Sequence, residues 1–274
     1  GISISLGATT ASGDAFTMDS ADSAAGFTLN ATNYREIINS TKISASGVTI
    51  TAGDLTDALT VSVITTNSTI TLNGGDGANF SASISELNIG ASGWSITMPE
   101  LGNGLTILES KFSGSGTIVA TNSIDSISAS SVSNSGYTQT VDIDLREDSA
   151  ADKVAYIAGA GKDILVLRNF DSGEDVLTLQ SAGAVNVVHN ATSMGIGTAA
   201  TIIGDALGLS LSSSNLASAA TMAAGQGSAI YTYNGDTYYL GMMDGDATFE
   251  DGEMIVRFIG VLDAGAAAAD IVEA

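Results

Sequence analysis

Residues 48–51 read Val-Thr-Ile-Thr and residues 59–64 read Leu-Thr-Val-Ser-Val-Ile, so apolar and polar side chains alternate along each run. Such alternation is typical of a β-strand with one face in a core and the other in solvent. Similar runs recur from Gly1 to about Asn134, with Gly, Asn and Asp between them. Short strands and frequent turns predict a mainly β fold, either a β-solenoid (β-roll) or a β-sandwich, although no strict repeat is evident.

The composition limits the kinds of partner that this chain is expected to bind. It has 274 residues, 44% of them hydrophobic, which is enough for a sizeable core. Asp and Glu outnumber Lys and Arg by 30 to 8, and the formal net charge is −22. Such a surface repels nucleic acid and favours cations such as Ca²⁺. There is no Cys, which excludes disulfides and thiolate metal sites.

The sequence changes character near residue 136, which predicts two domains. Residues 1–135 form a β-rich domain, and residues 136–274 form a second domain with a calcium-binding, β-roll-like part and a meander. One or two short helices are expected within about 192–224, the clearest at residues 215–224. Two alternating runs around Asn234-Gly235 predict a β-hairpin over residues 229–241, and residues 253–260 predict the next strand.

Residues 158–166 read AGAGKDILV and resemble the calcium-binding nonapeptide G-G-x-G-x-D-x-U-x. Gly159, Gly161 and Asp163 occupy the matching positions, where glycines permit tight turns and the carboxylate supplies the hard oxygen that Ca²⁺ prefers. The alternative is a plain glycine turn before a strand. A weaker copy lies at residues 74–82, with Asp76 and Asn79 as candidate ligands.

Two further acidic turns are candidate calcium sites. Asp171 and Asp175 flank Gly173 just before an alternating run, and they are either ligands or part of a solvated turn. The loop near residues 244–251 carries Asp244, Asp246 and Asp251. Its alternative is a charged tip that keeps edge strands apart.

The stretch AGAGKDILVLRNFDSGEDVLTLQ at residues 158–180, together with the aromatic hairpin, acidic loop and final apolar strand, resembles the carboxy-terminal part of bacterial S-layer and other repeats-in-toxin (RTX) proteins. The resemblance covers about the last 120 residues. It implies type I secretion, a location outside the cell or on its surface, calcium-triggered folding and self-assembly into a layer or filament.

Other functions have less support in the sequence. The only His is His189, which leaves no His pair for zinc and no triad motif around it, so no catalytic activity is expected. Paired carboxylates for a polysaccharide-active enzyme stay a minor alternative, and Trp94, which could stack on sugars, is expected in the core. Rows of Thr, as at Thr65-Thr66 and residues 69–71, are either an adhesive or ice-binding face or ordinary strand surface. A calcium-dependent adhesin or carbohydrate-binding module for a cell-surface polysaccharide is the second candidate.

The sequence also predicts how copies assemble. No apolar run reaches the roughly 18 residues of a membrane-spanning helix. The chain begins with Gly, and we expect either a processed product or a fragment. Residues 1–6 (Gly-Ile-Ser-Ile-Ser-Leu) form an alternating strand suited to pairing with another copy, so deleting them should abolish a homopolymer and leave a folded monomer.

Overall fold

The computed structural model describes most of the chain. The described residues are 1–7, 15–31, 37–52, 58–66, 70–73, 81–90, 92–98, 100, 104–132, 135–181, 196–212, 214–215, 217–221, 229–241, 248–260 and 271–273.

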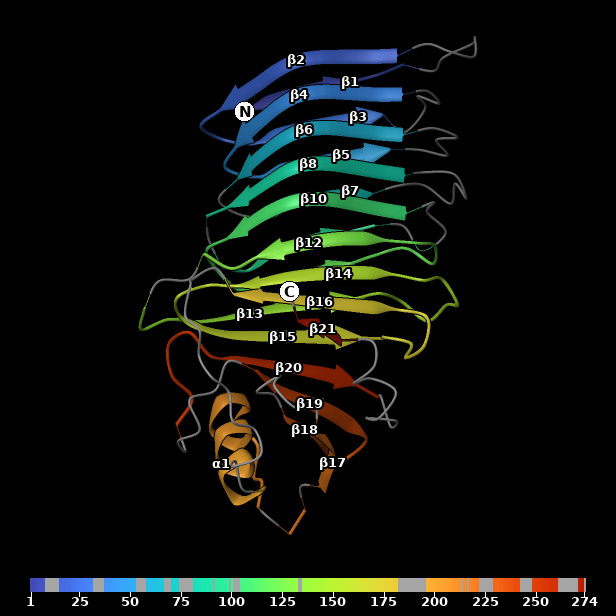
Figure 1. Cartoon of the computed structure of the whole chain (residues 1–274). Helices are drawn as coiled ribbons and strands as arrows, with labels where there is room; N and C mark the ends of the chain where they lie inside the picture. Colours follow the sequence, from blue (N-terminus) through green and yellow to red (C-terminus); the bar gives the residue numbers. More distant parts are fainter. Residues whose placement is uncertain are drawn as a thin grey trace.

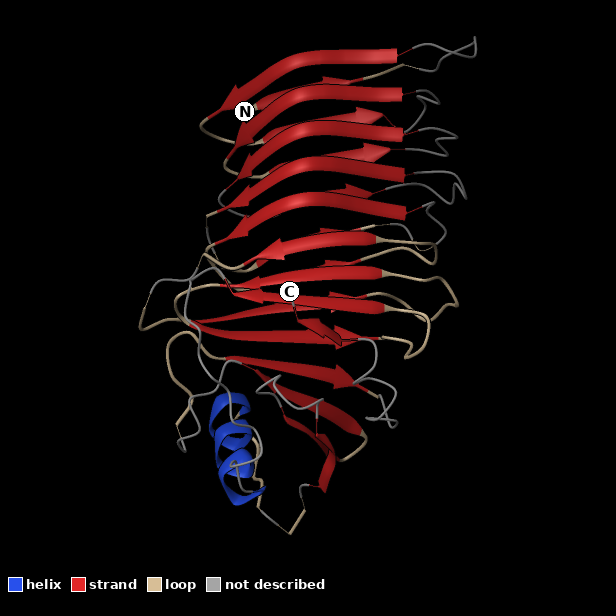
Figure 2. Cartoon of the chain, viewed as in Figure 1, coloured by secondary structure: helices blue, strands red, loops and turns tan. Residues whose placement is uncertain are grey.

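The chain forms a parallel β-solenoid in which successive strands alternate between two stacked layers (Figures 1 and 2). The long layer is one sheet, with the order β2 (Ala15–Ser23), β4 (Ile37–Ala45), β6 (Ala58–Thr66), β8 (Ser81–Ile89), β10 (Gly104–Phe112), β12 (Ser126–Ser130), β14 (Lys153–Ala158), β16 (Val176–Ser181) and β21 (Ile271–Glu273). The predicted mainly β solenoid is therefore confirmed.

The opposite layer contains two sheets. The first has the order β1 (Ile2–Ser5), β3 (Phe27–Ala31), β5 (Val48–Ala52) and β7 (Ile70–Asn73). The second has the order β17 (Ala217–Thr221), β18 (Ala229–Tyr233), β19 (Asp236–Gly241), β20 (Met254–Ile259), β15 (Lys162–Arg168), β13 (Thr138–Asp144), β11 (Gly116–Val119) and β9 (Trp94–Thr97). Strand β9 lies beside β7 and continues the layer.

Strand register reveals a repeat that sequence inspection missed. Phe27 lies 25 residues after its β1 partner Ile2, Val48 lies 21 residues after Phe27, and Ile70 lies 22 residues after Val48. The coil length varies because the turns differ in length while the paired strand positions stay in register. Variable turns hide a repeat from inspection by eye, even though each coil stacks on the last.

The long strands from β2 to β10 bend at one shared position, and Figure 1 shows the resulting curvature. In β8 the buried residues are Ala82, Ile84, Leu87 and Ile89, so the alternation shifts by one residue at the middle of the strand. The pairing of β6 with β8 shows the same step, because it runs to Val61↔Ile84 and resumes at Val63↔Glu86. This bend lets one strand supply inward side chains to both halves of a coil.

One hydrophobic cluster runs along the interior of the solenoid. Trp94 is 1% exposed, as expected, and its ring centroid lies 4.3 Å from that of Phe112. The Trp94 indole N–H donates to the Gly114 carbonyl at 2.7 Å. At the N-terminal end the cluster is less covered, and the side chains packed there are only partly buried: Ile2, Ile4, Leu6, Phe16 and Met18.

The C-terminal residues extend one layer beyond the solenoid. Strand β20 pairs parallel to β15, and β19, β18 and β17 follow in antiparallel order. Helix α1 (Ile196–Leu207) shares a second hydrophobic cluster with alternate residues of these strands, such as Tyr238 and Ile255. Because Tyr239 and Val256 belong to the interior cluster, this sheet is buried on both faces.

Both the hairpin and the meander are confirmed. Strands β18 and β19 pair from Ala229↔Leu240 to Tyr233↔Asp236, and β20 pairs antiparallel with β19. Asn234 and Gly235 have φ angles of 52° and 89°, which the tight turn requires.

The helix predicted at residues 215–224 is wrong, because residues 217–221 form β17. This segment pairs with β18 from Ala217↔Thr232 to Thr221↔Ala229, so pairing at the sheet edge outweighs the high helix propensity of its alanines. Helix α1 instead lies earlier in the predicted 192–224 interval. It ends before Gly208, which has a φ of 66°, and the Leu209 amide donates to the Gly204 carbonyl at 2.9 Å.

Strand pairing is continuous across residue 135, since β12 pairs with β14 and β11 with β13. The division into domains at residues 1–135 and 136–274 stays a prediction.

Candidate functional site

The turn predicted to bind calcium at residues 159–163 closes on itself through hydrogen bonds. The Gly159 amide donates to Oδ2 of Asp163 at 2.7 Å, and the Tyr156 hydroxyl donates to Oδ1 at 3.3 Å. The Gly161 carbonyl accepts the Gly252 amide at 2.8 Å. Asp163 is fully buried at the start of β15, so its carboxylate holds the turn before this strand.

The turn at residues 171–175 uses the same geometry. The Asp171 amide donates to Oδ2 of Asp175 at 2.7 Å, and the Asp171 carbonyl accepts the Asp175 amide at 2.9 Å. Oδ1 of Asp175 accepts the amide of Asp152 from the preceding coil at 2.9 Å. The carboxylate of Asp175 is buried, whereas Asp171 is exposed.

Asp251, from the predicted acidic loop near residues 244–251, hydrogen-bonds to a segment that is distant in the sequence. Its carboxylate accepts the Ser135 hydroxyl and the Gly136 amide, the latter at 2.9 and 2.8 Å. The hydroxyl and amide donors, together with the nearby charge of Lys162, lower the pKa of Asp251. This contact ties the corner before β13 to the segment before β20.

The candidate ligands are not assembled into one centre. Asp163 lies at the start of β15 and Asp175 directly precedes β16, which belong to opposite layers. Asp76, Asn79, Asp244, Asp246 and His189 lie outside the described residues. Within the described ranges, no group of three or more His, Cys, Asp or Glu side chains is arranged to hold a metal ion. Calcium binding stays a prediction.

Three buried aspartates, Asp125, Asp152 and Asp175, form a column at the amino-terminal ends of β12, β14 and β16 in the long sheet. Of these three, sequence reasoning singled out Asp175 alone. Oδ1 of Asp175 accepts the Asp152 amide, Oδ1 of Asp152 accepts the Asp125 amide at 2.7 Å, and Oδ1 of Asp125 accepts the Leu105 amide. Asp125 also accepts the Thr121 amide at 3.0 Å. Each carboxylate thus fastens one coil to the preceding one. A signal was present, since each Asp stands just before an alternating run.

Burial dominates the electrostatics of this column. Asp125 and Asp152 are 0% and 2% exposed, and burial raises the pKa of Asp125 to about 6. The pKa of Asp152 is raised to about 8, first by burial and then by the charges of Asp125, Asp175 and Asp148. Burial likewise raises the pKa of Asp175. Amide donors lower each pKa but do not outweigh the loss of solvation.

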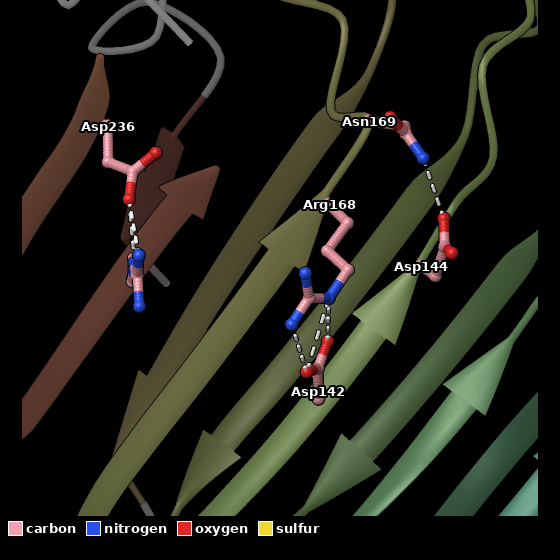
Figure 3. A network of polar contacts seen from close by, with 6 residues as sticks. Asp142, Asp144, Arg168, Asn169 and Asp236 are labelled. Atoms are coloured by element: carbon pink, nitrogen blue, oxygen red, sulfur yellow. Dashed lines mark hydrogen bonds and ion pairs between the residues drawn. The ribbon is translucent and has the colours of Figure 1, made fainter. Parts of the chain in front are cut away.

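Charged side chains also cross the outer surface of β13, β15 and β19 (Figure 3). Arg168 donates to both carboxylate oxygens of Asp142, with its Nη2 at 2.8 Å from Oδ2. Asn169 donates to Asp144 at 2.8 Å, and Arg257 donates to Asp236 at 2.6 Å. The Arg168–Asp142 pair joins β15 to β13 within the solenoid, and the Arg257–Asp236 pair joins β20 to β19 within the C-terminal meander.

In the first coils, the sheet of β1, β3, β5 and β7 carries no charged side chain. Register places Ser3, Thr28, Thr49 and Thr71 in one column across β1, β3, β5 and β7. The side chains of Thr65 and Thr66, like residue 69, lie outside the described part of the structure. The adhesive or ice-binding role of such threonine rows stays a prediction.

In the part of the chain that the structure describes, β1 and β2 are the terminal strands of their sheets. The amides of Ile2 and Leu6 donate to the carbonyls of Gly26 and Asn30 on the β3 side, at 2.9 and 2.8 Å. Successive amides of a strand point to opposite edges, so those of Ser3 and Ser5 point away from β3. Among the described strands, none pairs with this edge of β1 or with the matching edge of β2.

No helix within the described ranges is long and apolar enough to cross a membrane. No protein-family model, curated protein or solved structure matches the chain.

Proposed function

We propose that the chain is an extracellular structural protein that assembles with copies of itself through the edge strands of its N-terminal coil. The observation that carries this proposal is the pair of free edges on β1 and β2 above partly buried apolar side chains. Unpaired amides and carbonyls on an edge strand are a template for strand addition. The apolar side chains beneath them gain burial when another strand covers them.

The two ends of the described solenoid support a directional assembly. At the C-terminal end, β17 to β20 and helix α1 continue one layer and enclose a second hydrophobic cluster. At the N-terminal end, Ile2 and Ile4 are half-buried in a strand that pairs on one side. Assembly by the N-terminal edge therefore covers apolar surface that the described residues leave accessible.

In this proposal, calcium binding switches assembly on. With a net charge of −22, copies repel one another, and a bound divalent cation lowers this repulsion. The carboxylates of Asp163 and Asp175 already accept backbone amides, so the exposed acidic side chains are the better candidates for bridging copies.

Sedimentation velocity and negative-stain microscopy test the proposal, in calcium and in excess EGTA. We expect a regular polymer in calcium and smaller species in EGTA. Ser3→Pro removes an amide that points to the free edge but leaves the bonds of Ile2 and Leu6 to β3 intact, whereas Ser3→Ala keeps that amide.

Ser3→Pro should assemble poorly and keep the circular dichroism spectrum of the wild type, while Ser3→Ala should assemble normally. A wild-type protein that stays monomeric at all concentrations would overturn self-assembly. Equal polymer from both variants would overturn the role of the edge, and equal polymer in EGTA would overturn the calcium switch.

A further inference from the structure

A polar cavity of about 430 Å³ lies where the solenoid meets the C-terminal meander. Its volume falls within the range of small-ligand pockets. The walls come from β13, β15, α1 and the segment before β20, and the lining residues are Thr138, Lys162, Asp205, Ala206, Thr248, Phe249 and Glu250.

The lining presents one cation beside several oxygen acceptors. The ammonium of Lys162 lies 5.9 Å from the centroid of the Phe249 ring. Ion pairs in the described part of the chain are made by Lys111, Arg168 and Arg257, so the three N–H donors of Lys162 are available to a ligand. Asp205 and Glu250 are exposed and carry carboxylates, Oε1 of Glu250 accepts the Thr248 hydroxyl at 3.0 Å, and Thr138 supplies a second hydroxyl.

An exposed aromatic residue lies one position before the cavity lining in the sequence. Tyr137 directly precedes the lining residue Thr138 and is 69% exposed. Its carbonyl accepts the Lys162 amide at 2.9 Å, and the preceding residues Ser135 and Gly136 donate to Asp251. The backbone around this tyrosine is therefore fixed from two sides, which reduces the entropy lost on binding.

We propose that this cavity binds a neutral pyranose sugar, as a terminal or internal unit of a polysaccharide. In this proposal vicinal hydroxyls donate to Asp205 and Glu250 and accept from Lys162, and the exposed ring of Tyr137, one residue before the lining, stacks on the sugar. Acidic sugars are disfavoured because the wall carries two carboxylates, Asp251 lies nearby and the whole chain carries a charge of −22. This site is independent of self-assembly through β1.

Saturation-transfer NMR and calorimetric titration with methyl glycosides of glucose, galactose, mannose and N-acetylglucosamine test the proposal, with methyl glucuronide as the acidic probe. We expect saturable binding of at least one neutral glycoside. Lys162→Met should weaken it by about ten- to a hundredfold, as for loss of a hydrogen bond to a charged group. Tyr137→Ala should weaken it too.

Lys153→Met is the matched control, because it removes an exposed lysine from β14, which contributes nothing to the cavity lining. It should bind like the wild type, and all three variants should keep the wild-type circular dichroism spectrum. The proposal is overturned by an absence of saturable binding to every neutral glycoside, by unchanged affinity in both Lys162→Met and Tyr137→Ala, or by a preference for the glucuronide.

Discussion

Replacing Asp152 tests whether the aspartate column stabilises the solenoid through its acceptor oxygens or through its charge. Oδ1 of Asp152 accepts the Asp125 amide at 2.7 Å in a site where both residues are almost fully buried. Asp152→Asn keeps a side-chain oxygen of the same reach and removes the charge. Asp152→Ala removes the acceptor as well.

The two variants should differ clearly in stability. In Asp152→Ala the buried Asp125 amide loses its partner, which costs about 2 kcal/mol. For a chain of this size that loss lowers the melting temperature by roughly 4–8 °C. Asp152→Asn should match the wild type at neutral pH, because a pKa of about 8 already leaves most of the Asp152 carboxyl uncharged there, and it should exceed the wild type above pH 8, where ionised Asp152 would face the charges of Asp125, Asp175 and Asp148.

The pH dependence has a definite sign. Folding raises the pKa of Asp152 from 3.8 to about 8 and that of Asp125 to about 6, so over this interval the native state binds more protons than the unfolded chain. The stabilisation is complete below the unfolded pKa and is lost as pH rises through the folded values. Wild-type stability should therefore fall from about pH 4 to pH 9, and Asp152→Asn should show a smaller fall.

Thermal melts followed by circular dichroism across that pH range check these expectations. The reasoning fails if Asp152→Asn loses as much stability as Asp152→Ala, because the ionised charge would then be the stabilising feature. It also fails if the wild-type melting temperature does not change with pH.

Two further substitutions test how coils are fastened. Gly116→Ala should lower the free energy of unfolding by about 1–3 kcal/mol, because an added Cβ would meet the Trp94 ring at 2.1 Å, and urea unfolding measures this loss. Gly136→Ala is the comparison that separates overpacking from backbone strain, because its added Cβ meets nothing within 4 Å while its φ is 86°. Arg146→Met should lower the free energy of unfolding by about 2 kcal/mol, because Arg146 donates to the Ala120 carbonyl at 2.7 Å and to the Met98 carbonyl at 3.0 Å. Arg146→Lys should be nearly as destabilising, since an ammonium lacks the planar fork of the guanidinium. A wild-type urea midpoint in either variant would refute this role.

Much of the strand pattern could be predicted from local sequence. The runs at residues 48–51 and 59–64 lie in β5 and β6, and Asn234-Gly235 marks the turn between β18 and β19. Period-two alternation and tight-turn chemistry involve neighbouring residues, so they are legible without knowledge of the fold. The segment at residues 217–221 was mispredicted because its partner β18 is a tertiary feature.

The candidate site was less accessible to sequence reasoning. The pattern Gly-x-Gly-x-Asp locates the turn at residues 159–163 but cannot tell whether the Asp163 carboxylate faces a cation or an amide. The cavity beside Lys162 draws on four separate segments, and Tyr137 has no local pattern that distinguishes it from other tyrosines. Such proximity depends on long-range packing.

By itself, the sequence determined that the chain is acidic, free of cysteine and built from short alternating strands, because composition and period-two patterning need no partner. Only the tertiary structure decided that these strands stack in parallel coils in two layers, that Asp125, Asp152 and Asp175 form one column, and that Lys162 faces a cavity. The physical reason is that each of these features joins residues about one coil or more apart. Their pairing depends on stacking register, which the variable turns conceal in the linear sequence.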